Sequence, residues 1–264
     1  MGIAKVNVKE VFYAYENKKD VLKEIDFSLQ SGKILSILSP NGCGKTTLLK
    51  CINGILHLRS GSILLDNKDI SIYRVHELAK KIAYIPQFHN PIFPYKVIDM
   101  VLMGRNPYIP LYSFPRKNDI AITYQSLREL GIEYLAEKKY SELSGGERQL
   151  IFFARILAQQ AELLLLDEPA SHLDLSNQIK ILDMIKQLSN FGITIIMSTH
   201  IPDQALMISD NCILMKEGQL YVYGDPEIVI NTRNIEQVFG VSSMIIDSPY
   251  PANRKICVPI SSII

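Results

Sequence analysis

The sequence predicts an α/β fold in which a mainly parallel central sheet carries an N-terminal antiparallel accessory sheet and a helical insertion. Three short runs are almost entirely apolar and show no alternation, which is typical of strands that a parallel sheet buries on both faces. The N-terminal region instead alternates apolar and polar residues, which indicates half-exposed antiparallel strands. The middle of the chain changes to a helical period, and this change predicts the insertion.

The elements can be placed along the chain. Alternation predicts half-exposed antiparallel strands at 5–15 and 62–70, with an Asn-Lys-Asp turn in the second, and apolar runs predict strands at 34–38, 163–166 and 193–197. Helical periods predict helices near 96–104, 118–130 and 145–160, and an 18-residue amphipathic helix from Ser176 onward. A Glu-Gly turn predicts a hairpin from segments 212–216 and 219–223.

These elements are expected to form one domain over residues 1–264. The core and its antiparallel sheet are expected at about 1–87 and 161–240, the insertion at about 88–160 and a C-terminal tail at about 241–264. Prolines predict loops at the approach to the insertion: Pro86, Pro91, Pro94, Pro107, Pro110 and Pro115. With 47% apolar residues, the chain can bury a sizeable core.

Charge and cysteine content exclude several classes of function. The 28 basic and 27 acidic residues give a net charge of +1, so we expect no nucleic-acid partner. The four cysteines have neither CxxC nor His-paired spacing, so we expect no zinc site. No window approaches the roughly 20 apolar residues of a spanning helix, so we expect a cytoplasmic chain that meets the membrane through partner proteins.

A phosphate-binding loop follows the apolar run at 34–38. Residues 39–47 read SPNGCGKTT and lead into a helical pattern, which is the strand, loop and helix order of a P-loop. Lys45 is expected to reach the β- and γ-phosphates of a nucleotide, Thr46 to hold Mg²⁺ and Thr47 to support a phosphate. The candidate nucleotide-binding residues of this loop are Asn41, Gly42, Cys43, Gly44, Lys45, Thr46 and Thr47.

The loop departs from the usual motif at its first position. This chain has Ser39 where glycine is usual, and serine tolerates unusual backbone angles less readily. Because the first position ends the strand without touching phosphate, we expect Ser39 to modify loop geometry without abolishing binding.

Two adjacent carboxylates end another apolar run. Asp167 and Glu168 follow the leucines at 163–166, and α/β sheets bind their ligands at such strand ends. Asp167 suits a magnesium role through water, and Glu168 suits a general base or a group that polarises the attacking water.

A second glycine loop precedes the helix expected at 145–160. Ser144, Gly145 and Gly146 present free backbone N–H groups at a helix start, which predicts a second phosphate site. Spacing alone leaves two alternatives open, because the two loops can fold together or meet across a dimer.

Three segments closely resemble the ABC ATPase family: LSGGERQ at 143–149, the loop at 39–47 and LLLLDEP at 163–169. The resemblance implies a P-loop NTPase (RecA-like) core that binds and hydrolyses ATP with Mg²⁺. It also implies a head-to-tail dimer, in which the 143–149 signature loop of one copy completes the ATP site of the other.

Further site residues are implied by the same resemblance. Tyr15 is similar to the aromatic residue that stacks on adenine, with Tyr13 as its rival, and Gln87 to the Q-loop glutamine. His200 is similar to the switch histidine that senses the γ-phosphate, and residues 171–174 resemble the D-loop, which includes Asp174. The catalytic candidates are therefore Glu168, His200 and Gln87, and the metal candidates are Thr46, Gln87 and Asp167.

A transport role is indicated by two more segments. VIDMVLMGRNP at 97–107 and the C-terminal stretch at 224–241 are similar to importers of iron siderophores, haem and cobalamin. The alternatives are a molybdate or tungstate importer and a non-transport ABC clamp. The resemblance implies two transmembrane permease subunits, an extracytoplasmic substrate-binding protein and a peripheral position on the cytoplasmic face of the membrane.

Overall fold

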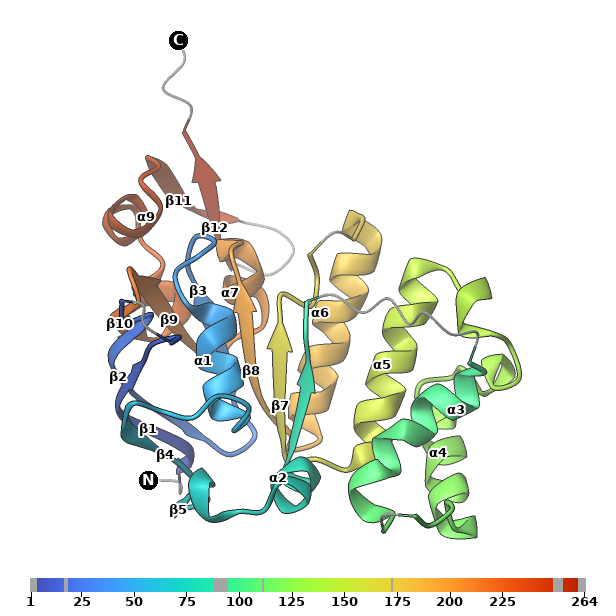
Figure 1. Ribbon diagram of the computed structural model, residues 1–264. Coiled ribbons are helices and arrows are strands. Elements are labelled where there is room, and N and C mark those ends of the chain that lie inside the picture. The colour runs from blue at the N-terminus through green and yellow to red at the C-terminus, as the bar shows by residue number, and fades with distance from the viewer. Residues whose placement is uncertain are drawn as a thin grey trace.

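The computed structural model describes residues 4–16, 19–87, 95–110, 112–171, 173–248 and 254–260 (Figure 1). Pro91, Pro94 and His172, which the sequence analysis places in loops, lie outside the described residues. Among the described helices, none is long and apolar enough to cross a membrane.

The central sheet has six strands in the order β10-β9-β3-β8-β7-β6. Its strands are β3 (Ile34–Leu38), β6 (Ile82–Ile85), β7 (Leu163–Asp167), β8 (Thr194–Thr199), β9 (Asn211–Lys216) and β10 (Gln219–Gly224). All neighbours pair in parallel except β9 and β10, which form the predicted hairpin. The three apolar runs are confirmed as central strands, and every residue of β3, β7 and β8 is buried.

The antiparallel sheet has the order β2-β1-β4-β5. Its strands are β1 (Ala4–Tyr13), β2 (Leu22–Gln30), β4 (Ser60–Leu65) and β5 (Lys68–Asp69). The turn predicted inside 62–70 lies one residue earlier than expected, at Asp66 and Asn67, whose positive φ angles of 51° and 63° suit a two-residue hairpin turn between β4 and β5. One face of this sheet packs against α1 (Lys45–Ile52) and the central sheet in a shared apolar core.

Helices form a layer beside the central sheet, on the right in Figure 1. This layer contains α3 (Val97–Leu102), α4 (Lys117–Glu129) and α5 (Gly145–Gln159), and α6 (Leu175–Asn190) lies between it and the strands. The helix predicted at 96–104 changes to a 3₁₀ turn at Met103–Tyr108. There Gly104 lies so close to α5 that a Cβ would stand 2.3 Å from the Arg155 carbonyl oxygen.

Arg105 joins three parts of this layer. Its buried guanidinium donates from Nε to Asp119 Oδ1 at 3.1 Å and from Nη1 to the Ala158 carbonyl at 2.8 Å. It also stacks on Tyr108, with 3.9 Å between Cζ and the ring centroid. Buried charges are tolerated when they are paired in this way, so the Arg105 contacts tie α4 and α5 together.

The remaining helices are α2 (Val75–Lys81), α7 (Pro202–Ile208), α8 (Pro226–Val229) and α9 (Thr232–Phe239). Where the sequence analysis expects a tail, the chain forms a hairpin of β11 (Ser243–Ser248) and β12 (Arg254–Pro259). This hairpin is held to α7, because the Cys257 N–H donates to Asp203 Oδ1 at 2.9 Å.

Candidate nucleotide-binding site

The P-loop connects β3 to α1 through two glycines in the left-handed region. Gly42 and Gly44 have φ angles of 84° and 98°, which glycine adopts without a steric penalty. Gly44 also lies against the segment before β2, because a Cβ there would stand 3.1 Å from the Val21 carbonyl oxygen. The first turn of α1 contains no acidic residue, so its N-terminus can receive an anion.

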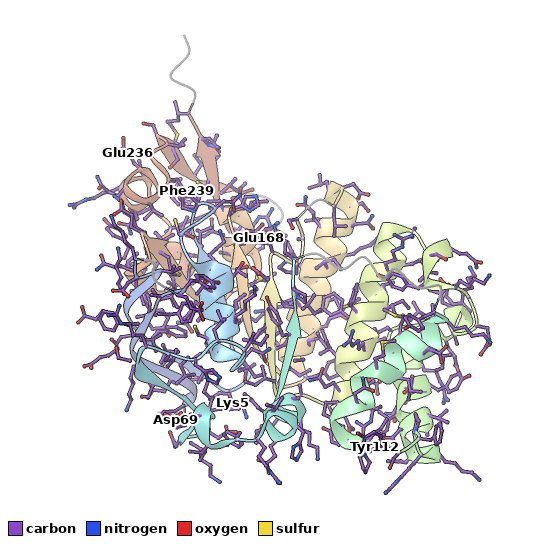
Figure 2. The ribbon with its side chains drawn as sticks, viewed as in Figure 1. Lys5, Asp69, Tyr112, Glu168, Glu236 and Phe239 are labelled. Atoms are coloured by element: carbon purple, nitrogen blue, oxygen red, sulfur yellow. The ribbon has the colours of Figure 1, made fainter. Side chains whose placement is uncertain are left out.

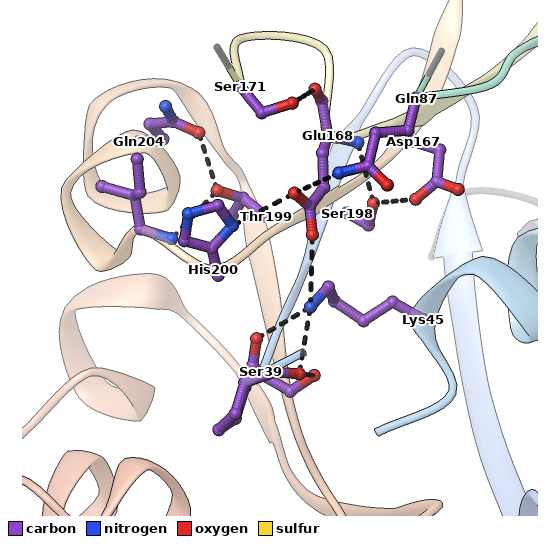
Figure 3. Close-up of polar contacts among 12 residues, drawn as sticks. Ser39, Lys45, Gln87, Asp167, Glu168, Ser171, Ser198, Thr199, His200 and Gln204 are labelled. Atoms are coloured by element: carbon purple, nitrogen blue, oxygen red, sulfur yellow. Dashed lines mark hydrogen bonds and ion pairs between the residues drawn. The ribbon is translucent and has the colours of Figure 1, made fainter. Parts of the chain in front are cut away.

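Lys45 is buried and lies across this loop (Figure 3). Its Nζ donates to the carbonyl oxygens of Ser39 at 2.9 Å and Pro40 at 3.1 Å. The same ammonium lies 3.5 Å from Glu168 Oε1. Lys45 therefore joins the loop to the Glu168 carboxylate, which directly follows β7.

Ser39 does not need the conformation that glycine would supply. Its φ is not positive, and its buried hydroxyl donates to the Pro40 carbonyl at 3.1 Å. Its backbone N–H donates to the Thr199 carbonyl of β8 at 3.4 Å. Serine is thus accommodated at this position within the normal geometry of a strand end.

The adjacent carboxylates are fixed by Ser198 of β8. The Ser198 hydroxyl donates to Asp167 Oδ1 at 2.6 Å and accepts from the Glu168 N–H at 2.9 Å. Glu168 has a φ of 49°, a strained value for a residue other than glycine that is found most often at functional sites. Sequence reasoning gave Ser198 no role, although its place two residues before His200 is a usable signal.

Three candidate side chains converge on the Glu168 carboxylate, which is buried at the upper end of the central strands in Figure 2. Gln87 Nε2 donates to Oε2 at 3.0 Å, and His200 Nδ1 lies 3.2 Å from the same oxygen. Lys45 approaches Oε1, as described above. The carboxyl ends of parallel strands are where such folds bind ligands, and this arrangement holds a base in one orientation there.

The two tyrosines before β2 differ in exposure. Tyr13 is buried, whereas 39% of Tyr15 is exposed. The Tyr15 hydroxyl lies 3.3 Å from Thr47 Oγ1 in α1. The rings of Tyr13 and Tyr15 meet edge to face, with 5.0 Å between their centroids. The Tyr15 ring is therefore accessible to the adenine of a nucleotide bound at the P-loop, which favours Tyr15 over Tyr13 as the stacking residue.

The 143–149 signature loop forms the start of α5. Ser144 Oγ accepts from the Glu147 N–H at 3.3 Å, and the Ser144 N–H donates to Glu147 Oε2 at 2.8 Å, which is a capping box. These hydrogen bonds with Ser144 outweigh a smaller opposing effect of desolvation, so the pKa of Glu147 lies below its usual value. Ser144 and Gly145 are exposed.

Asp174 lies beside this loop. Its Oδ1 accepts from the Asn177 N–H and its Oδ2 from Asn177 Nδ2, each at 2.8 Å, so it caps α6. A Cβ on Gly146 would stand 2.7 Å from Asn177 Oδ1, which shows how closely the two helix starts approach. Within the described residues, no hydrogen bond or ion pair joins Ser144, Gly146 or Asp174 to the P-loop.

The candidates therefore divide into two groups. The first surrounds the P-loop and comprises Tyr15, Lys45, Thr47, Gln87, Asp167, Glu168 and His200. The second comprises Ser144, Gly145, Gly146 and Asp174 at two neighbouring helix starts. Asn41 and Gly42 are exposed and Cys43 and Thr46 are half-buried on the P-loop itself.

Comparison with known proteins identifies the family. A family profile described as ABC transporter matches residues 22–171, which is more than half of the chain. The chain belongs to the ABC transporter family. An ABC transporter ATP-binding protein of Haemophilus influenzae is 41% identical over 228 residues, covering 86% of each chain.

Two further relatives are named for the substrate that they help to transport. The ferric enterobactin transport ATP-binding protein FepC of Escherichia coli is 31% identical, covering 98% of this chain and 95% of its own. The molybdate import ATP-binding protein MolC of Haemophilus influenzae is 33% identical, covering 89% of this chain and 87% of its own. A solved metal-chelate type ABC transporter in an inward-facing conformation superposes with a TM-score of 0.87 at 30% identity, covering 98% of each chain.

Proposed function

We propose that this chain is the ATP-hydrolysing subunit of an importer for a metal chelate of the iron-siderophore, haem or cobalamin type. The observation that carries the ATPase assignment is the convergence of Lys45, Gln87 and His200 on the Glu168 carboxylate. The metal-chelate assignment is supported by the similarity to FepC and to the metal-chelate type transporter over almost the whole chain.

The residues of the P-loop group have separable roles in hydrolysis. The backbone N–H groups of the loop and Lys45 bind the phosphates of ATP, and Tyr15 stacks on the adenine. Glu168 accepts a proton from the attacking water, or polarises it, while Gln87 orients that water. His200 lies close enough to Glu168 to contact the γ-phosphate region, so it can report whether that phosphate is present.

Magnesium fits the oxygen groups of this site. Ser198 donates to Asp167 Oδ1, and among the described residues Oδ2 receives no hydrogen bond, so it remains available to metal-bound water. Thr46 supplies a hydroxyl oxygen and Gln87 an amide oxygen, which are hard ligands of the kind that Mg²⁺ prefers. The ion would neutralise charge on the phosphates, and few protein ligands are needed because Mg²⁺ keeps several waters.

A second copy of the chain supplies a second phosphate-binding helix start to the ATP held by the P-loop group. Ser144 and Gly145 are exposed at the start of a 15-residue helix, where free N–H groups and the helix dipole favour a phosphate. In a head-to-tail dimer these groups and Asp174 face the ATP bound by the partner's P-loop. ATP then closes the dimer, and hydrolysis opens it.

A groove between the core and the helical layer suits the permease. It has a volume of about 920 Å³ and lies between the end of α1, α2, the turn at Met103–Tyr108 and α5. Exposed apolar side chains line it, including Ile55 and Val75, which are 53% and 88% exposed. Each of two copies would dock one transmembrane subunit here on the cytoplasmic face, while an extracytoplasmic binding protein delivers the cargo.

Molybdate or tungstate import is the second candidate, supported by the similarity to MolC. The two candidates differ in the cargo that stimulates ATP hydrolysis. The test is ATPase activity of the chain with its permease in liposomes, with a binding protein and iron siderophore, haem, cobalamin or molybdate. Stimulation by a chelate supports the proposal, stimulation by molybdate alone replaces it with the second candidate, and indifference to every cargo contradicts import.

A further inference from the structure

Tyr84 lies between the groove and the carboxylates of β7. It is on β6, where it pairs with Leu165 of β7, two residues before Asp167. Because side chains alternate along a strand, Leu165 and Asp167 lie on the same face of β7, and Tyr84 neighbours that face. The Tyr84 ring also lines the groove.

The Tyr84 hydroxyl is buried without a hydrogen-bond partner among the described residues. A buried hydroxyl without a partner costs free energy, so native proteins seldom keep one without a reason. A phenolic hydroxyl is protonated at neutral pH, so it can donate a hydrogen bond. The Asp167 carboxylate meanwhile has one oxygen, Oδ2, to which no described residue donates.

We propose that Tyr84 is a positioning residue for Asp167, and that its hydroxyl donates a hydrogen bond to this carboxylate when magnesium nucleotide is bound. With Ser198 on the other oxygen, the carboxylate would then be held from two sides in the orientation that magnesium-bound water requires. This inference rests on the proposed ATPase function and assigns it one more residue.

The test compares Tyr84→Phe with Tyr73→Phe. Phenylalanine keeps the ring that lines the groove and removes the hydroxyl, and Tyr73 lines the same groove without a contact to Asp167. Electron paramagnetic resonance would measure Mn²⁺ binding in the presence of a non-hydrolysable ATP analogue. Because partners of metal-binding groups typically change metal affinity by 10-fold or more, we expect about tenfold weaker Mn²⁺ binding in Tyr84→Phe and no change in Tyr73→Phe.

Two further readouts separate positioning from a structural role. The Mg²⁺ concentration for half-maximal ATPase activity should rise by about the same factor, while kcat at saturating Mg²⁺ stays within about twofold. The melting temperature of the nucleotide-free variant should stay the same or rise, because an unpaired buried hydroxyl has been removed.

Unchanged Mn²⁺ affinity in Tyr84→Phe would overturn the inference. A fall in affinity accompanied by a lower melting temperature without nucleotide would also overturn it, in favour of a structural role. Failure of the proposed function would look different, because the wild-type chain itself would then bind no Mn²⁺ with the analogue.

Discussion

The P-loop group and the signature-loop group differ in how completely each is assembled within one chain. In the first group, strands β3, β6, β7 and β8 bring Lys45, Gln87 and His200 onto one carboxylate. In the second, Ser144 and Asp174 make hydrogen bonds that cap their own helices, and their outer surfaces stay exposed.

Under the proposed function, this difference separates the part of the ATP site that one chain assembles by itself from the part that a second copy must complete. In the proposed mechanism a carboxylate that activates water must be held in position before the reaction, and contacts inside the sheet hold Glu168 in this way. The helix start at Ser144 can bind a phosphate, and no described contact of this chain brings its own P-loop to it.

The largest effect is expected for Glu168→Gln. The variant keeps the shape of the side chain and loses the base, so turnover should fall by about 100-fold or more while ATP binding persists. Single-turnover hydrolysis and nucleotide binding would measure both, with the exposed Glu129→Gln on α4 as the matched control. Hydrolysis at the wild-type rate would remove Glu168 from its assigned role.

Lys45→Ala should weaken ATP binding itself. The variant removes the ammonium that bridges the loop and Glu168, and about 10- to 100-fold lower affinity is expected for the loss of a charge-assisted phosphate contact. Equilibrium binding of a fluorescent ATP analogue is the measurement. Lys50→Ala, at the other end of α1, should bind normally. Equal affinities for Lys45→Ala and the wild type would contradict the P-loop assignment.

Tyr15→Ala should lower ATP affinity by about tenfold, because stacking of a base on an aromatic ring contributes about 1–3 kcal/mol. Tyr15→Phe should bind almost normally, since it keeps the ring and loses the hydroxyl near Thr47. A competition assay between ATP and inorganic triphosphate would show whether the loss concerns the base. If triphosphate binding falls equally, Tyr15 supports the loop instead of the adenine.

The smallest effect is expected for the capping box of α5. Because the pKa of Glu147 is lowered in the folded chain, its ionised form stabilises the fold above its usual pKa of 4.5, and this contribution is lost as pH falls below that value. Glu147→Gln should therefore cost about 0.5 kcal/mol or less at pH 7, since Glu147 is largely solvent-screened. Urea unfolding at pH 7 and pH 4 would test this, and a difference that grows toward pH 4 would contradict it.

The sequence predicted the helices and strands that have a strong local pattern, such as an apolar run or a helix cap. The apolar runs of β3 and β7 and the serine-capped start of α5 are in this class. β2 was missed although residues 25–30 alternate apolar and polar; Glu24, with a φ of 52°, shifts the register between Leu22 and Ile25, so the alternation does not extend to the start of the strand. β6 was missed because its four residues follow α2 without a turn residue between them.

The sequence predicted which residues belong to the site, but it did not predict which of their side chains contact one another. Motifs placed Lys45 and Glu168 on the list of candidates, but their approach depends on the order of strands in the sheet. The roles of Ser198 and Tyr84 follow from contacts across neighbouring strands, and of the two only Ser198, two residues before His200, has a signal in the sequence. The domain bounds and the composite dimer site stay predictions.

The central claim is that each ATP needs the P-loop of one copy and the signature loop of another. Sedimentation of Glu168→Gln with ATP and Mg²⁺ tests it most directly, alone and combined with Ser144→Arg. The account predicts a dimer for Glu168→Gln and a monomer that still binds ATP for the double variant, while the smaller Ser144→Ala, which also loses the cap, still dimerises. An ATP-dependent dimer that forms equally well with Ser144→Arg would contradict the account.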